Sequence, residues 1–191
     1  MSETKDIPIV VVERIPFWLA VALTVLVSMP FGLWLGEYNF ALWCAFIVWA
    51  EYFALGAKPE AMKVVIPSFC YAAFITAITL TLTPFLDFLP DVCTSGDLTI
   101  SVGLFVGVCF LVYSMRWSDT FKQGSLPFFN GMSMALGLYF TGSFPEMGIV
   151  PGPFAAAIWA SVMCLFGCFL GWFNVTITFP LEKNDFGEDE T

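Results

Sequence analysis

Residues 49–53 read Trp-Ala-Glu-Tyr-Phe, which places Glu51 inside a long apolar stretch. An ionised side chain in hydrocarbon costs roughly 2.5–3.5 kcal/mol on insertion scales, so Glu51 should face protein or water, or carry a proton. One interpretation is a carboxylate that lines a pore or couples transport to an ion. The other is a residue near the cytoplasmic end of its helix that reaches water, a tyrosine or Lys58. The sequence leaves both open.

Asn130 and Pro30 also lie inside apolar stretches, where their chemistry could serve a permeation path. The amide of Asn130 could recognise a polar solute, or it could bond a neighbouring helix. Pro30 removes a backbone hydrogen bond, and its segment is the best candidate in the sequence for a broken helix of the kind that lines cavities in membrane proteins. Ordinary tolerance of proline in a membrane span is the alternative.

Side chains needed for several other chemistries are missing from the sequence. The chain has no His, which excludes His-based metal sites, haem ligation by His and His proton relays. It also has no Gly-rich phosphate loop ending in Lys. We therefore expect no metal, no cofactor and no catalytic residues. The protein is not expected to be an enzyme, and an intramembrane enzyme is a lesser alternative.

The elements that must position these residues are apolar helices. The chain is 59% hydrophobic and 12% charged, whereas soluble domains are about a quarter charged. A helix needs about 20 apolar residues to cross roughly 30 Å of hydrocarbon. We predict an all-α polytopic membrane protein with six transmembrane helices. The apolar runs are residues 17–36, 40–55, 64–85, 98–113, 126–144 and 154–173.

The basic residues fix an orientation for these six spans. All seven Lys and Arg side chains fall on one side of the membrane, and the other side receives only acidic ones. Because Lys and Arg are retained in the cytoplasm, both termini should be cytoplasmic. The net charge of −9, with no basic cluster, argues against a nucleic-acid partner.

Two stretches, residues 52–67 and 139–151, share one pattern: Tyr-Phe, then Gly, then Pro-Glu, then Pro. The last proline of each is expected to open an Ala-rich helix. Three spans in each half would insert the second half upside down, which gives the inverted repeat found in many transporters. The alternative is similar helix-end chemistry without duplication, since aromatic residues, Gly and Pro all favour helix ends.

Counted from the aligned tyrosines, Asn130 corresponds to Trp43. If the halves are related, these two residues lie at comparable depth from opposite faces of the membrane, and an aromatic ring beside an amide would suit a filter for small solutes. The candidate pore or substrate-binding residues are Glu51, Asn130, Trp43, Tyr52, Tyr139 and Pro30. The expected divisions are a cytoplasmic segment (1–15), repeat one (16–86), an external loop (87–95), repeat two (96–175) and an acidic cytoplasmic tail (176–191).

Pairs of glycines four residues apart predict close helix packing. Gly103 and Gly107 form one pair, and Gly167 and Gly171 form the other. Small residues let helices approach closely, either within one chain or between the subunits of a homo-oligomer. Outside the apolar runs, Arg116 and Asp119 have a spacing suited to a local ion pair.

Several segments together resemble a family of small bacterial inner-membrane proteins known as domain of unknown function 1097. The resemblance lies in Trp-Ala-x-Tyr-Phe-Ala-x-Gly at residues 49–56 and in the closing Gly-x-x-x-Gly-Trp at 167–172. It spans residues 16–175. The family's Pro-Gly-x-Phe entry to a later helix is not matched at residues 127–131, which read Pro-Phe-Phe-Asn-Gly. The resemblance implies a multi-span protein of the bacterial inner membrane and no particular activity.

Two functions remain open from the sequence. The first is a channel or secondary transporter for a small polar solute or ion. The second is a non-catalytic accessory or anchoring subunit of a larger membrane complex. The expected partners are the lipid bilayer, the solute, further copies of the chain, and a protein partner bound through the acidic tail.

Overall fold

The computed structural model describes residues 13–179. Over that range the chain is helical, with no strand. The acidic tail beyond residue 179, which we considered as a docking segment, lies outside the described residues.

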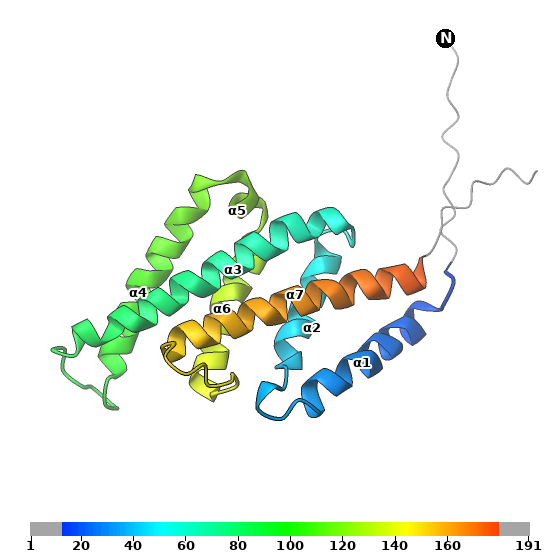
Figure 1. Cartoon of the computed structure of the whole chain (residues 1–191). Helices are drawn as coiled ribbons and strands as arrows, with labels where there is room; N and C mark the ends of the chain where they lie inside the picture. Colours follow the sequence, from blue (N-terminus) through cyan, green and yellow to red (C-terminus); the bar gives the residue numbers. More distant parts are fainter. Residues whose placement is uncertain (1–12, 180–191) are drawn as a thin grey trace, which may run out of the picture.

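Each of the six apolar runs forms one helix (Figure 1). A short helix, α5, and three 3-10 turns complete the described part of the chain. The six helices are α1 (Phe17–Leu33), α2 (Leu42–Ala54), α3 (Pro59–Leu82), α4 (Asp97–Ser114), α6 (Ser125–Thr141) and α7 (Gly152–Thr178). The remaining elements are η1 (Gly36–Tyr38), η2 (Thr83–Leu86), η3 (Met115–Trp117) and α5 (Asp119–Gln123).

Three of these helices are long and apolar enough to cross a membrane. With their adjoining 3-10 turns they cover Pro59–Leu86, Asp97–Trp117 and Gly152–Thr178. Helix α1 is also apolar, and its 17 residues make it slightly shorter. The fold is therefore that of a helical protein with three candidate membrane spans among its described residues.

Helix α3 begins earlier than the sequence pattern predicted. We expected Pro67 to open this helix, but Pro67 lies inside it and Pro59 is its first residue. Proline suits the first helical position, because the N–H that it lacks would have no helical partner there. Pro151, in contrast, does precede α7 directly. The prediction for Pro67 was wrong, because Pro59 begins α3, whereas Pro151 lies immediately before α7.

The repeated glycines end two helices in the same way. Gly56 follows α2 with φ +102° and Gly142 follows α6 with φ +63°. Glycine adopts positive φ without the steric penalty that a Cβ brings, which makes it the usual residue just past a helix end. The glycine part of the pattern therefore has a local cause in both halves, whether or not the halves arose by duplication.

Helices α3 and α7 form the centre of the bundle and pack against each other. Helix α6 packs on α3, and α2 packs on α7. On the outside, α4 lies against α3 and α1 lies against α7. Exchanging α1 with α4, α2 with α6 and α3 with α7 converts α3–α6 into α2–α7 and α3–α4 into α1–α7, and it leaves the α3–α7 pair unchanged.

The links between helices alternate between two sides of the bundle. In Figure 1 the α1–α2, α3–α4 and α6–α7 links lie along the lower side, and the α2–α3 link and α5 lie along the upper side. Small side chains fill much of the core between the central helices, among them Ala45, Ala73, Ala156, Ala160 and Cys164. Such a core lets backbones approach closely without large side chains between them.

Candidate functional site

Helices α2 and α6 form an antiparallel seam that joins the two halves of the chain. At one end of the seam, Asn130 of α6 donates a hydrogen bond from Nδ2 to Oε1 of Glu51 on α2. At the other end, Trp43 of α2 lies over Gly137 of α6, where a Cβ would come within 3.0 Å of the indole ring. The two polar residues singled out in the sequence, 79 positions apart, are therefore direct partners.

The Glu51 carboxyl group is buried and only half satisfied. The residue is 2% exposed, and its second oxygen, Oε2, has no hydrogen-bond partner. No Lys or Arg within residues 13–179 forms an ion pair with it, since the ion pair in that range joins Lys122 to Asp119. An acidic group in this setting needs a proton, a cation or a water molecule for its second oxygen.

Other buried polar atoms around the central helices also lack a protein partner. Most buried polar side-chain atoms in proteins have at least one hydrogen bond, so each exception calls for an explanation. Besides Glu51 Oε2, the unpartnered atoms are the hydroxyls of Tyr52, Ser68 and Tyr71, the indole nitrogens of Trp49 and Trp159, and Asn174 Oδ1. The interior of the described bundle thus keeps spare hydrogen-bonding capacity.

Asn130 and Trp43 lie at opposite ends of the seam and do not contact each other, because Asn130 pairs with Glu51 while Trp43 contacts Gly137, about 10 Å further along α6. The aromatic ring and the amide therefore do not form a filter side by side. Of the two interpretations of Pro30, the structure agrees with ordinary tolerance, because α1 continues through Pro30 to Leu33.

The two candidate tyrosines occupy different environments. Tyr52 is fully buried, and its ring lies against Gly171 of α7. Tyr139 is half-buried near the end of α6, where it contacts Phe140 and lies beside Gly152. Tyr52 follows Glu51 in the chain, but its ring lies against α7. Tyr139 lies at the opposite end of the seam.

All four predicted packing glycines contact another helix or turn of the same chain. Gly103 and Gly107 on α4 lie against Thr83 and Thr79, respectively. On α7, Gly171 lies against Tyr52, and Gly167 lies against the Ala45 carbonyl oxygen of α2. A Cβ at Gly167 would clash with that carbonyl.

Gly131 makes a similar close contact between α6 and α3, and the sequence pattern did not reveal it. It lies on α6 directly against the Phe69 carbonyl oxygen of α3. Its neighbour Asn130 drew attention as a polar residue, but Gly131 has no glycine four residues away and so did not match the packing pattern.

A pocket of about 440 Å³ opens at the Trp43 end of the seam. It lies between the α1–α2 link and the beginning of the α6–α7 link. The side chains that line it are mostly aromatic or polar, and they include Glu37, Asn39, Phe40, Trp43, Ser143 and Phe144. The seam therefore has a pocket at one end and the buried Glu51–Asn130 pair at the other.

A second buried amide, Asn174, was also missed. Asn174 Nδ2 donates to Thr24 Oγ1 over 3.0 Å, and both residues are fully buried. This hydrogen bond joins α7 to α1. The predicted sixth run stopped at Phe173, whereas α7 continues to Thr178, so Asn174 was counted with the flanking sequence. Extending the predicted sixth helix by one more turn would have placed the Asn174 amide inside it.

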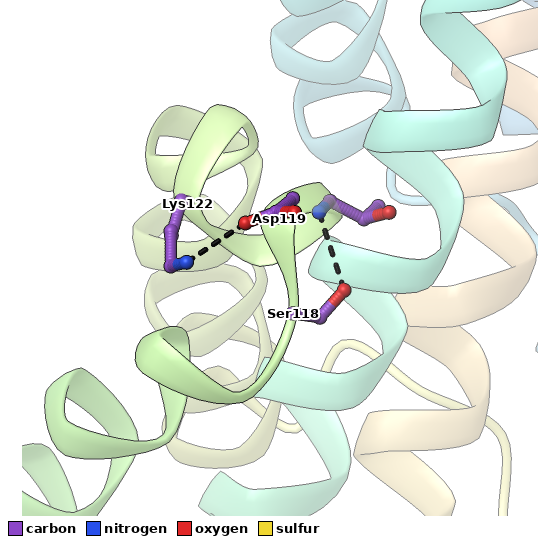
Figure 2. A network of polar contacts seen from close by, with 4 residues as sticks. Ser118, Asp119 and Lys122 are labelled. Atoms are coloured by element: carbon purple, nitrogen blue, oxygen red, sulfur yellow. Dashed lines mark hydrogen bonds and ion pairs between the residues drawn. The ribbon is translucent and has the colours of Figure 1, made fainter.

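The local ion pair near α5 differs from the predicted one. Asp119 pairs with Lys122 over 2.7 Å, and Arg116 instead lies over the Tyr113 ring, 5.3 Å from its centre. Figure 2 shows this pair together with Ser118, whose hydroxyl accepts the Thr120 N–H at the start of α5. The hydrogen bond and positive charge of Lys122 lower the pKa of Asp119. Because both side chains are exposed, the pair adds little to stability.

The seam offers side chains that are suited to binding. It presents one carboxyl group, one amide and aromatic rings in apolar surroundings. Such groups can hold and release a proton, a cation or a polar solute. No known protein family, curated protein or solved structure matches the chain.

Proposed function

We propose that this protein is an integral membrane channel or secondary transporter for a small polar solute or ion. The observation that carries the proposal is the Glu51–Asn130 pair. It joins the two halves of the chain, it is buried in an apolar helical bundle, and one carboxyl oxygen remains free to bind. Ionisable residues inside membrane segments are costly and most often serve ion or substrate pathways.

Six spans in two inverted repeats form part of this proposal. Its support is the exchange of packed pairs between α1–α2–α3 and α4–α6–α7, together with the alternation of the links. With 13 and 17 residues, α2 and α6 are about 20 and about 26 Å long, less than the roughly 30 Å of hydrocarbon. Because α2 and α6 are short, they would leave space above their ends, which is where the pocket lies.

The charges suggest how such a protein would be oriented. The α1–α2, α3–α4 and α6–α7 links carry acidic residues and no Lys or Arg, so we place them outside the cell. Both termini would then be cytoplasmic. The bacterial inner membrane is the location that the resemblance to domain of unknown function 1097 implies.

The test is transport by the purified full-length protein in liposomes. We expect liposomes that contain it to take up small polar solutes or ions faster than empty ones. Glu51→Gln keeps an acceptor for Asn130 but removes the acid, so it should lower the flux severalfold. Glu60→Gln, an exposed acid in the first turn of α3, is the matched control and should leave the flux unchanged. Flux equal to that of empty liposomes for every solute would contradict the proposal.

An accessory membrane subunit is the second candidate, and a groove on the outside of the bundle favours it. The groove lies between α3 and α4, has a volume of about 680 Å³ and is lined almost entirely by apolar side chains. A helix of another subunit could pack there. Extraction in a mild detergent followed by mass measurement separates the candidates, because an accessory subunit should retain other chains in fixed proportion.

A further inference from the structure

The pocket at the Trp43 end of the seam combines aromatic surface with a carboxylate. Its lining includes the aromatic residues Phe40, Trp43 and Phe144 and the acidic residue Glu37. Trp43 is 43% exposed, so part of this residue is accessible. The volume of about 440 Å³ lies within the range of sites for small organic ligands.

Glu37 provides the net charge of this pocket. None of the side chains that line it is Lys or Arg. Two helix ends meet beside it, the beginning of α2 at Leu42 and the end of α6 at Gly142. A helix carries partial positive charge at its first turn and partial negative charge at its last, so these two contributions offset each other. The pocket therefore favours a cation over an anion.

The lining also distinguishes between kinds of cation. A divalent metal takes about six or more oxygen ligands in a tight shell, and this pocket offers one carboxylate in a much larger space. An organic ammonium ion needs a ring face within about 6 Å and a nearby negative charge, and it fills a larger volume. The aromatic and acidic groups fit the second ligand.

The seam continues from the pocket to a second acidic residue. Trp43 contacts Gly137 at the pocket end of the seam, and the α2–α6 contact continues to Glu51, whose second oxygen has no partner. Glu37 and Glu51 are thus the two acidic residues along this line, and the pocket lining contains no Lys or Arg. We infer that the solute is a small organic ammonium cation and that the pocket lined by Glu37 and Trp43 is its outer binding site. This inference rests on the proposed transport function.

Binding of choline to the purified full-length protein tests the site without requiring transport. Its uncharged counterpart is 3,3-dimethyl-1-butanol, which has the same shape and no positive charge. Titration calorimetry should show choline binding about three- to thirtyfold more tightly than the alcohol, from the ring and carboxylate contributions together. Equal affinity for the two, or no binding of choline, would overturn the inference.

Variants of the lining residues assign the binding to this pocket. Trp43→Leu and Glu37→Gln should each weaken choline binding about two- to fivefold. The matched controls are Trp34→Leu, a more exposed tryptophan outside the pocket, and Glu146→Gln, an exposed acid of the α6–α7 link. Trp43→Phe keeps a ring and guards against misfolding of the leucine variant. If the controls weakened binding as much as the lining variants, the site would lie elsewhere and the inference would fail.

Uptake of labelled choline into liposomes separates this inference from the function it rests on. If Glu37→Gln reduces choline uptake and Glu146→Gln leaves it unchanged, the inference and the transport function are both supported. Flux of other solutes without choline binding would overturn the choice of solute while the transport function stands. Choline binding at the pocket with no flux of any solute would overturn the transport function and leave the binding site supported.

Discussion

At the scale of single residues, the Glu51–Asn130 hydrogen bond should measurably stabilise the bundle. Asn130→Leu would leave both oxygens of a buried acid without a partner, which costs about 1–3 kcal/mol. Glu51→Gln should cost less, because its amide oxygen can still accept from Asn130. Denaturant unfolding in detergent, followed by circular dichroism, measures both changes.

Ser133→Ala is the control for this pair. Ser133 lies on the exposed side of α6, and its hydroxyl bonds only to the Phe129 carbonyl of its own helix. Its replacement should change the unfolding free energy by less than about 0.5 kcal/mol. If Asn130→Leu were no more destabilising than Ser133→Ala, the interhelical hydrogen bond would be absent in solution.

The second buried amide leads to a separate prediction about α1. Asn174→Leu removes the hydrogen bond to Thr24 and should cost about 1 kcal/mol. Because this bond joins α7 to α1, the α1 amides should exchange with deuterium faster, and the α3 amides should not. Thr176→Ala, at an exposed position of α7, is the control and should leave exchange in α1 unchanged.

At the scale of helices, packing depends on where a glycine meets backbone. A Cβ at Gly131 would clash with the Phe69 carbonyl of α3, and a backbone carbonyl cannot rotate away as a side chain can. We expect Gly131→Ala to destabilise the fold by about 1–3 kcal/mol, in the range of overpacked cores. Thermal unfolding of the detergent-solubilised protein measures the loss.

Gly137 provides a control within the same helix. Its added Cβ would come within 3.0 Å of the Trp43 ring, a half-exposed side chain that can shift by a few tenths of an ångström. Gly137→Ala should therefore cost less than Gly131→Ala. The reverse order would show that α6 does not approach α3 as closely as the structure indicates.

The positions of the helices could be predicted from the sequence, whereas their ends could not. The long apolar runs predicted the positions of all six major helices, because a helix that is kept from water is apolar along most of its length. Pro59 opens α3 although Glu60 and Lys63 make its first turns polar, so hydropathy alone placed the start too late. A proline at the first helical position was the local signal for the true start of α3, and a prediction based on hydropathy did not use it.

The contacts between residues needed the three-dimensional structure. Glu51 and Asn130 each attracted attention as polar residues in apolar runs, but only the antiparallel arrangement of α2 and α6 makes them partners. The same arrangement separates Asn130 from Trp43, which the repeat alignment had placed opposite each other. Sequence patterns therefore identified the candidate residues, and the register between helices determined which of them meet.

At the scale of the whole molecule, the exposed Cys93 is a natural reporter of sidedness. It lies in the α3–α4 link, which a six-span topology places outside the cell. A membrane-impermeant maleimide added to intact cells should label the wild-type chain and not Cys93→Ser. The other cysteines are buried or lie within helices, where a water-soluble reagent reacts slowly.

Cysteines introduced on the other side complete the topology test. Lys63→Cys in α3 and Lys122→Cys in α5, each in the Cys93→Ser background, should resist the reagent in intact cells and react in inside-out vesicles. Both residues are expected on the cytoplasmic side, because Lys and Arg are retained there. Their position on one side is also what two oppositely inserted halves require, since α3 begins and α4 ends on that side. Labelling of the two positions from opposite sides of the membrane would rule out the six-span arrangement and the inverted repeat together.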